Sequence, residues 1–259
     1  MYSYNFLALL NEAQFANETL ASGATQIRKA AFYSKGLYFL AFTSLSVGLE
    51  RIGKICLMLD YAISNSGEYP SLQFIRNQIG HNLVSLYEHS QIIKQQRNFL
   101  DNELHQEALV ILSDFAGGER YSNIDLILTG KANSPVARWF DKIDKKLFAL
   151  KVPEKKKQKI AYEAAEMHEL TKDFAYFDHI LEDGTRITKP GDYYFGVGFA
   201  RAISPYRQLL VLQIIRYWVE LVMNLGQAAM ASDIEVPFFS EIFAQYFNPD
   251  SYLRTRKRW

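Results

Sequence analysis

Residues 37–65 read LYFLAFTSLSVGLERIGKICLMLDYAISN, and this stretch decides the fold class. It contains no proline, and apolar side chains cover nearly the whole circumference of a helix as far as Val47. A helix that is apolar all round is a central helix surrounded by others. A stop follows at Asn65-Ser66-Gly67, with Pro70 a few residues beyond. We therefore predict one long core helix over residues 37–65.

Helical periodicity continues outside this stretch, whereas strand-like alternation is rare. Residues 21–23, Ala-Ser-Gly, predict a break between two helices, and residues 190–198 are expected to be irregular. The dipeptide Asp183-Gly184 predicts a small β-hairpin. The fold class is therefore predicted to be all-α. The predicted helices cover residues 5–20, 24–35, 37–65, 72–94, 98–116, 138–149, 153–177, 200–230 with a bend at Pro205, and 237–247.

A linker-like stretch marks the best candidate for a domain boundary. It opens with Gly117-Gly118 and lasts to about Pro135. We predict a helical bundle over residues 1–116, a linker over 117–135 and a C-terminal helical extension over 136–259 that packs on the bundle.

The composition excludes some classes of protein. The 259 residues carry a formal net charge of +1, whereas a protein that coats nucleic acid is usually much more basic, so any nucleic-acid contact is local. The single cysteine, Cys56, forms no internal disulfide and builds no Cys-rich zinc site. It lies in an apolar run and is predicted to be buried. A reducing, cytoplasmic setting fits this cysteine content best.

No membrane segment is expected. The first residues lack the basic start and apolar core of a signal peptide. Residues 37–49 are uncharged but too few to span a bilayer. Residues 209–230 are long enough but contain Arg216 and Glu220, four apart, which could pair on one helix face. Both segments are predicted to be core helices.

The usual nucleotide-binding, metalloprotease and serine-hydrolase motifs are absent. A different pattern stands out. Residues 48–54 read Gly-Leu-Glu-Arg-Ile-Gly-Lys, and residues 76–83 read Arg-Asn-Gln-Ile-Gly-His-Asn-Leu. The second stretch places a basic residue, Arg76, and an amide, Asn77, shortly before a histidine, His81.

In these two stretches the chain resembles the HEPN superfamily of small helical bundles. Members have a helix with a Glu and a downstream Lys, here Glu50 and Lys54, and the next helix opens around a Gly-His-Asn/Asp-Leu pattern, here residues 80–83. Many members carry an Arg, a polar residue, a short spacer and then the His, here Arg76, Asn77 and His81. The resemblance covers residues 37–90 and extends through flanking helices to about residue 116. It implies metal-independent RNA cleavage without a cofactor, in which the 2′-hydroxyl attacks the neighbouring phosphate and leaves a cyclic phosphate end.

The resemblance also implies roles for single residues. His81 would act as the general acid or base, since imidazole moves protons near neutral pH. Arg76 would stabilise the phosphate through two parallel hydrogen bonds. Asn77 lies four residues before His81, on the same face of a helix, and would orient the imidazole or touch the phosphate. By family analogy, the setting is a bacterial-type toxin or antiviral-defence effector restrained by an inhibitory or antitoxin partner.

Helical geometry raises a difficulty for this site. Arg76 and His81 are five residues apart, which is about 140° around an ideal helix. Three resolutions are open: Gly80 marks a helix start or distortion, the long Arg76 side chain curls round, or two motifs face each other across the two-fold axis of a homodimer. We favour the homodimer, because the resemblance implies it. The apolar residues after the motif would then divide between the core and the interface, and these are Leu83, Val84, Leu86 and Tyr87.

Two rival interpretations remain. In the first, the chain is an inactive HEPN module that binds a protein partner. In the second, it is an unrelated helical protein. In both cases Arg76 is an ordinary surface residue, and Gly80-His81-Asn82 is a helix-opening turn with Asn82 as the cap. Glu50 and Lys54 then form a helix-stabilising pair.

Overall fold

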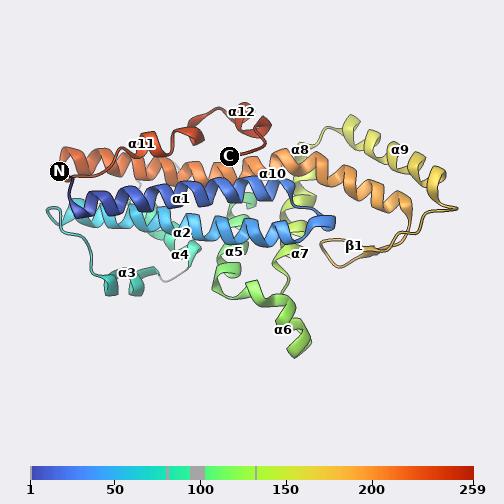
Figure 1. The fold of residues 1–259 in the computed structure, drawn as a ribbon, viewed down its shortest axis with the longest axis horizontal. Helices are drawn as coiled ribbons and strands as arrows, with labels where there is room; N and C mark the ends of the chain where they lie inside the picture. Colours follow the sequence, from blue (N-terminus) through green and yellow to red (C-terminus); the bar gives the residue numbers. More distant parts are fainter. Residues whose placement is uncertain (1, 80–81, 94–102, 132) are drawn as a thin grey trace.

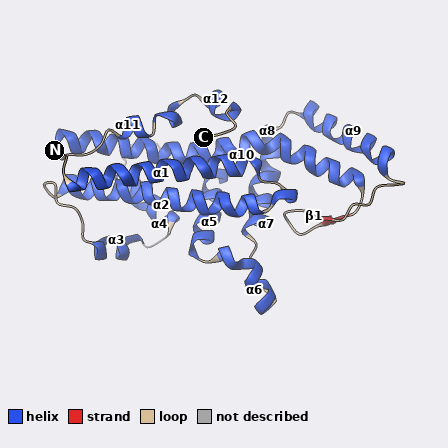
Figure 2. Cartoon of the chain, viewed as in Figure 1, coloured by secondary structure: helices blue, strands red, loops and turns tan. Residues whose placement is uncertain are grey.

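Three long helices form the body of the protein. The computed structural model describes residues 2–79, 82–93, 103–131 and 133–259. Helices α1 (Tyr4–Lys29), α2 (Gly36–Ser64) and α10 (Pro190–Ala231) lie side by side along the long axis (Figure 1). The described residues are almost wholly helical, with two short strands as the exception (Figure 2), which confirms the predicted all-α class.

Shorter elements surround these three helices. Helices α4 and α5 pack on α2, α9 packs on α10, and α6 projects from the body (Figure 1). The shorter helices are α3 (Leu72–Ile79), α4 (Leu83–Ile93), α5 (Glu103–Gly117), α6 (Ser122–Thr129), α7 (Pro135–Trp139), α8 (Lys145–Lys151), α9 (Glu154–Thr171), α11 (Phe239–Ile242) and α12 (Asp250–Thr255). The remaining elements are the helical turns η1 (Phe32–Ser34), η2 (Glu119–Tyr121), η3 (Phe140–Asp144) and η4 (Ala244–Phe247), and the strands β1 (His179–Ile180) and β2 (Arg186–Ile187).

The predicted break at residues 21–23 is wrong, because α1 continues through it. A Cβ atom on Gly23 would lie 2.6 Å from Cγ of Leu45, and one on Gly48 would lie 2.6 Å from Cγ of Leu20. Each glycine therefore makes room for a leucine of the facing helix. Close packing of α1 on α2 accounts for Gly23, which the sequence alone presents as a helix breaker.

Residues 190–198 are also helical, against the prediction, since α10 begins at Pro190. Proline suits the first turn of a helix, where its missing N–H is not needed. Gly198 lies where α10 meets α9, and a Cβ there would lie 2.6 Å from Cγ2 of Ile160. The predicted hairpin is confirmed: β1 and β2 pair antiparallel, and Gly184 has a φ of +89° in the turn between them.

One cluster of buried side chains runs through most of the molecule and contains residues from Leu9 to Leu253. Residues on both sides of the segment 117–135 therefore share a core, and that segment itself contains η2 and α6. The division of the chain into two domains stays a prediction. Cys56 is buried, as predicted.

Helix α10 is long and apolar enough to cross a membrane by length and composition, and among the described helices it is the one that meets this test. Within its most apolar window 67% of the residues are buried inside the protein, as in the core helix of a soluble protein. Arg216 interrupts this apolar surface and pairs with Asp250 of α12, with a distance of 2.9 Å between Nη2 and Oδ1.

Candidate functional site

Arg76 lies on α3, a short helix beside the end of α2. The Ser71 hydroxyl accepts a hydrogen bond from the N–H of Phe74 at 3.1 Å and caps the start of α3. The Phe74 ring packs on that of Tyr61 of α2, with 5.1 Å between centroids, and this contact holds α3 against the body. Arg76 is exposed and has neither a hydrogen bond nor an ion pair in the part of the chain that the structure describes.

The other two residues of the predicted site are only partly covered. The backbone of Asn77 belongs to α3, while its side chain lies outside what the structure describes. Gly80 and His81 lie outside the described residues altogether. The structure therefore does not test whether Arg76, Asn77 and His81 come together.

Helix α4 starts just after the motif, and its start is firmly anchored. Asn82 Oδ1 accepts hydrogen bonds from the N–H groups of Val84 and Ser85, both at 3.0 Å, so Asn82 is a helix cap, as one interpretation of the sequence expected. The Ser113 hydroxyl of α5 accepts from the N–H of Leu83 at 3.1 Å and donates to Asn82 Oδ1 at 3.2 Å. These bonds attach the first turn of α4 to α5.

The capped start of α4 changes the expected angle between Arg76 and His81, which is about 140° on one ideal helix. Helix α3 ends at Ile79 and α4 begins at Leu83, with the non-helical Asn82 before it. Arg76 and Leu83 therefore do not belong to one continuous helix. The angle of about 140° applies to residues on a single regular helix, so it is no objection to a site within one subunit. Leu83 and Leu86 are buried in the core, while Val84 and Tyr87 are half-buried.

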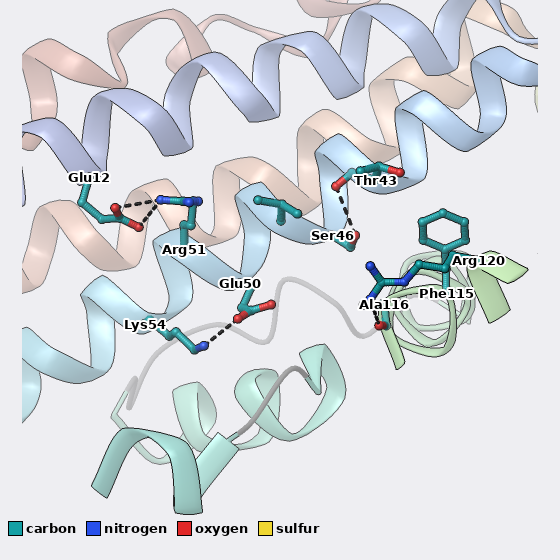
Figure 3. A pocket seen from close by; sticks show the side chains of 10 residues that line it. Glu12, Thr43, Ser46, Glu50, Arg51, Lys54, Phe115, Ala116 and Arg120 are labelled. Atoms are coloured by element: carbon teal, nitrogen blue, oxygen red, sulfur yellow. Dashed lines mark hydrogen bonds and ion pairs between the residues drawn. The ribbon is translucent and has the colours of Figure 1, made fainter. Parts of the chain in front are cut away.

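A charged pocket lies next to this region, between α2 and the end of α5 (Figure 3). It has a volume of about 420 Å³ and holds three cationic and two carboxylate side chains. It includes Glu50 and Lys54, the two residues that the resemblance singles out on α2. The lining residues are Glu12, Thr43, Ser46, Val47, Glu50, Arg51, Lys54, Phe115, Ala116 and Arg120.

Ion pairs hold most of the charges in this pocket. Lys54 Nζ lies 2.5 Å from Glu50 Oε1, which confirms the predicted pair four residues apart. Arg51 donates to both carboxylate oxygens of Glu12 on α1, at 2.7 and 2.8 Å. Arg120 donates to the carbonyl oxygen of Ala116 at 2.6 Å, at the end of α5.

Arg120 differs from the other two cations of this pocket within the described residues. In the described part of the chain it makes no ion pair, whereas Arg51 and Lys54 do. A second pocket of about 400 Å³ shares Glu12, Arg51 and Lys54 and extends along α1 and α2 toward Tyr69.

Among the described residues, no group of three or more His, Cys, Asp or Glu side chains is placed to hold a metal ion. The His89 ring nitrogen Nδ1 lies 2.8 Å from the carbonyl oxygen of Ser85, and His105 Nε2 lies 2.9 Å from Gln213 Oε1. Burial lowers the pKa of His105. The partner groups of these two histidines lie on α4 and α10, respectively.

The sequence analysis missed a buried ionic network. Arg207 of α10 donates to both carboxylate oxygens of Asp144, from Nε at 2.8 Å and from Nη2 at 2.5 Å, and both side chains are fully buried. Tyr38 and Trp139 also donate to Asp144, each at 3.1 Å. The position of Arg207 in an otherwise apolar stretch was a sign that this charge is buried, but nothing near it in the sequence indicated that Asp144 is its partner.

The network reaches the hairpin and the end of α1. The Tyr38 hydroxyl lies 3.2 Å from Glu182 Oε1, close to the hairpin turn. Arg207 Nη1 donates to the carbonyl oxygens of Ile27 and Ala30, at 3.1 and 2.7 Å. Burial raises the pKa of Glu182 and of Asp144. With no exposed reacting group, this network connects α1, α2, α10 and the hairpin and has a structural role.

Comparisons of the chain with protein-family models, with curated proteins and with solved structures find no match.

Proposed function

We propose that the protein is a metal-independent RNA endonuclease of the HEPN type, in which His81 transfers protons and Arg76 binds the reacting phosphate. The observation that carries the proposal is the exposed guanidinium of Arg76, which forms no ion pair within the described residues, on the helix that precedes the capped start of α4. A guanidinium free of carboxylates can form two parallel hydrogen bonds with a phosphate. Asn77 assists by orienting the imidazole or by touching the phosphate.

The proposed setting follows from the same family analogy. The enzyme works in the cytoplasm as a homodimer or larger even-numbered assembly, with its sites shared across a two-fold axis, and a partner protein restrains it. Its biological role is that of a toxin or an antiviral-defence effector. No cofactor takes part.

The test is cleavage of total RNA in the presence of EDTA. His81→Ala should lower the cleavage rate by roughly 10²–10⁴-fold, the usual range for loss of a general acid or base. Arg76→Lys should also lower it, because the charge stays but the bidentate geometry is lost. Arg201→Ala, an exposed arginine of α10, is the control for the same purification and should cleave like wild type.

Two results would contradict the proposal. Equal cleavage by wild type and a folded His81→Ala protein removes His81 from the mechanism. Strict dependence on added magnesium or manganese indicates a different chemistry.

A second function, a helical module that binds a protein partner without catalysis, is favoured by one feature. Helix α6 exposes large apolar side chains to solvent: Ile127 is 82% and Leu128 75% exposed. A cluster of large apolar side chains on the surface is typical of a protein contact. If α6 is a protein contact and the motif is inactive, total RNA stays intact in the cleavage test while Ile127→Ser abolishes binding to the partner.

A further inference from the structure

A dense group of cations lies far from Arg76. Residues 254–258 read Arg-Thr-Arg-Lys-Arg and cover the end of α12 and the segment after it. Arg254, Lys257 and Arg258 are exposed, and Arg256 is half-buried. None of these four side chains forms an ion pair with a carboxylate of the described residues, although Asp250 of α12 pairs with Arg216. In Figure 1, α12 and α3 lie on opposite edges of the molecule.

The backbone of this basic segment is fixed to α1. Arg28 Nη1 donates to the carbonyl oxygens of Arg254, at 2.7 Å, and of Arg256, at 3.4 Å. The N–H of Trp259 donates to the Thr25 hydroxyl at 3.0 Å. The segment is thus held in place before any ligand arrives, which reduces the entropy that binding costs.

Aromatic rings fix two of the arginine side chains. The Trp259 ring stacks on that of Tyr246, with 5.8 Å between centroids and 2° between planes. The guanidinium of Arg256 lies over the Trp259 ring at 4.4 Å, and that of Arg254 over the Tyr206 ring at 5.4 Å. An arginine held by its flat face still presents the edge of its guanidinium, and that edge binds phosphate in a bidentate manner. Arg256 uses its Nε to donate to the carbonyl oxygen of Arg258 at 2.7 Å, which leaves its two Nη groups for a ligand.

The charges indicate the kind of ligand. Four cations within five residues repel one another, and none of them forms an ion pair with a described carboxylate. A ligand with regularly spaced negative charges relieves this repulsion and releases its own counterions. Three of the four cations are arginines, and the planar guanidinium matches the geometry of a phosphate group.

We propose that residues 254–258 form a second RNA-contact surface, which binds backbone phosphates of a single-stranded RNA away from Arg76. The inference rests on the proposed function, because that function supplies RNA as the ligand. The surface anchors the substrate and takes no part in cleavage. Its loss should therefore raise KM and leave kcat unchanged.

The test measures binding of a fluorescent single-stranded 2′-O-methyl RNA, which lacks the attacking hydroxyl and stays intact. Fluorescence anisotropy over a series of salt concentrations compares wild type with the double variant Lys257→Ser/Arg258→Ser. Each lost phosphate contact reduces the slope of log K against log salt by about 0.7 for single strands, so the double variant should lose about 1.4. The matched control is Lys155→Ser/Lys156→Ser, which removes the same charge from exposed positions of α9 and should keep the wild-type slope.

Equal slopes for the two double variants would overturn the proposal, since the effect would then be one of net charge alone. Absence of RNA binding by wild type, with binding to vesicles that contain phosphatidylserine, would overturn it in favour of a membrane contact. The cleavage test separates the two proposals. If the double variant has a reduced slope but cleavage does not depend on His81, the RNA-contact surface is supported and the nuclease function is excluded. If cleavage depends on His81 but the slope is unchanged, the nuclease function is supported and the surface is excluded.

Discussion

At the scale of single residues, the ion pair between Arg207 and Asp144 is the contact most sensitive to substitution. Asp144→Asn leaves the Arg207 charge buried without its partner, and breaking a buried pair in this way costs about 3–5 kcal/mol of unfolding free energy. Urea unfolding measures the loss. The control is Asp141→Asn, which removes a half-exposed partner of Lys145 and should cost about 0–1 kcal/mol. Similar losses for the two variants would contradict the structural role of the network.

The burial of Glu182 predicts how the stability of the protein depends on pH. Burial raises its pKa above the ordinary value of 4.5, so the folded protein binds this proton more tightly than the unfolded chain. The contribution of Glu182 to stability is therefore greatest below about pH 4.5 and falls as the pH rises through the folded-state pKa. Glu182→Gln keeps an oxygen that can accept from Tyr38 and removes the charge.

The variant should consequently gain stability relative to wild type between acidic and neutral pH. Urea unfolding at a series of pH values gives the difference between the two proteins. Parallel stability curves would show that Glu182 titrates in the same way in both states.

At the scale of elements, the packing of α1 on α2 depends on small residues. In an exposed helix, glycine to alanine adds about 1 kcal/mol of stability. At Gly48 the added Cβ would lie 2.6 Å from Leu20 Cγ, so Gly48→Ala should instead cost about 1–3 kcal/mol through overpacking. Gly36→Ala at the start of α2 is the control, because a Cβ there meets no atom within 4 Å. Denaturant unfolding should give opposite signs, and a stabilised Gly48→Ala protein would argue against close contact of the helices.

At the scale of the whole molecule, the shared site predicts a pattern of complementation. A dimer with one Arg76→Ala and one His81→Ala subunit keeps one intact site, made from the Arg76 of one chain and the His81 of the other. Random exchange makes half of the dimers mixed, so the mixture should recover about a quarter of wild-type activity. Cleavage assays on mixtures, with exchange verified by native mass spectrometry, measure the recovery.

An inactive mixture with proven exchange would exclude the shared site. So would a fully active monomer, identified by light scattering at the working concentration. In that case the interval between α3 and α4 would have to bring Arg76 and His81 together within one chain.

Local patterns in the sequence were sufficient to predict much of the secondary structure of this molecule. The apolar run as far as Val47 predicted the first half of α2 as a core helix, because its composition leaves no polar face to expose. The cap at Asn82, the Glu50–Lys54 pair and the hairpin at Asp183-Gly184 were also predictable, since each depends on residues at most eight apart. The roles of Arg76, Asn77 and His81 came from the resemblance and stay predictions.

Tertiary structure decided the rest. Helix α1 runs through Gly23 because Leu45 fills the space beside it, and the helix of residues 190–198 packs on α9 at Gly198. Arg207 meets Asp144 across 63 positions of the chain, and Arg28 reaches Arg254 across 226. Periodicity and turn signals describe neighbours within a few residues, whereas these contacts arise only when distant helices come together. The partner of a buried charge, or of a segment held by a distant helix, therefore cannot be predicted from the residues next to it in the sequence.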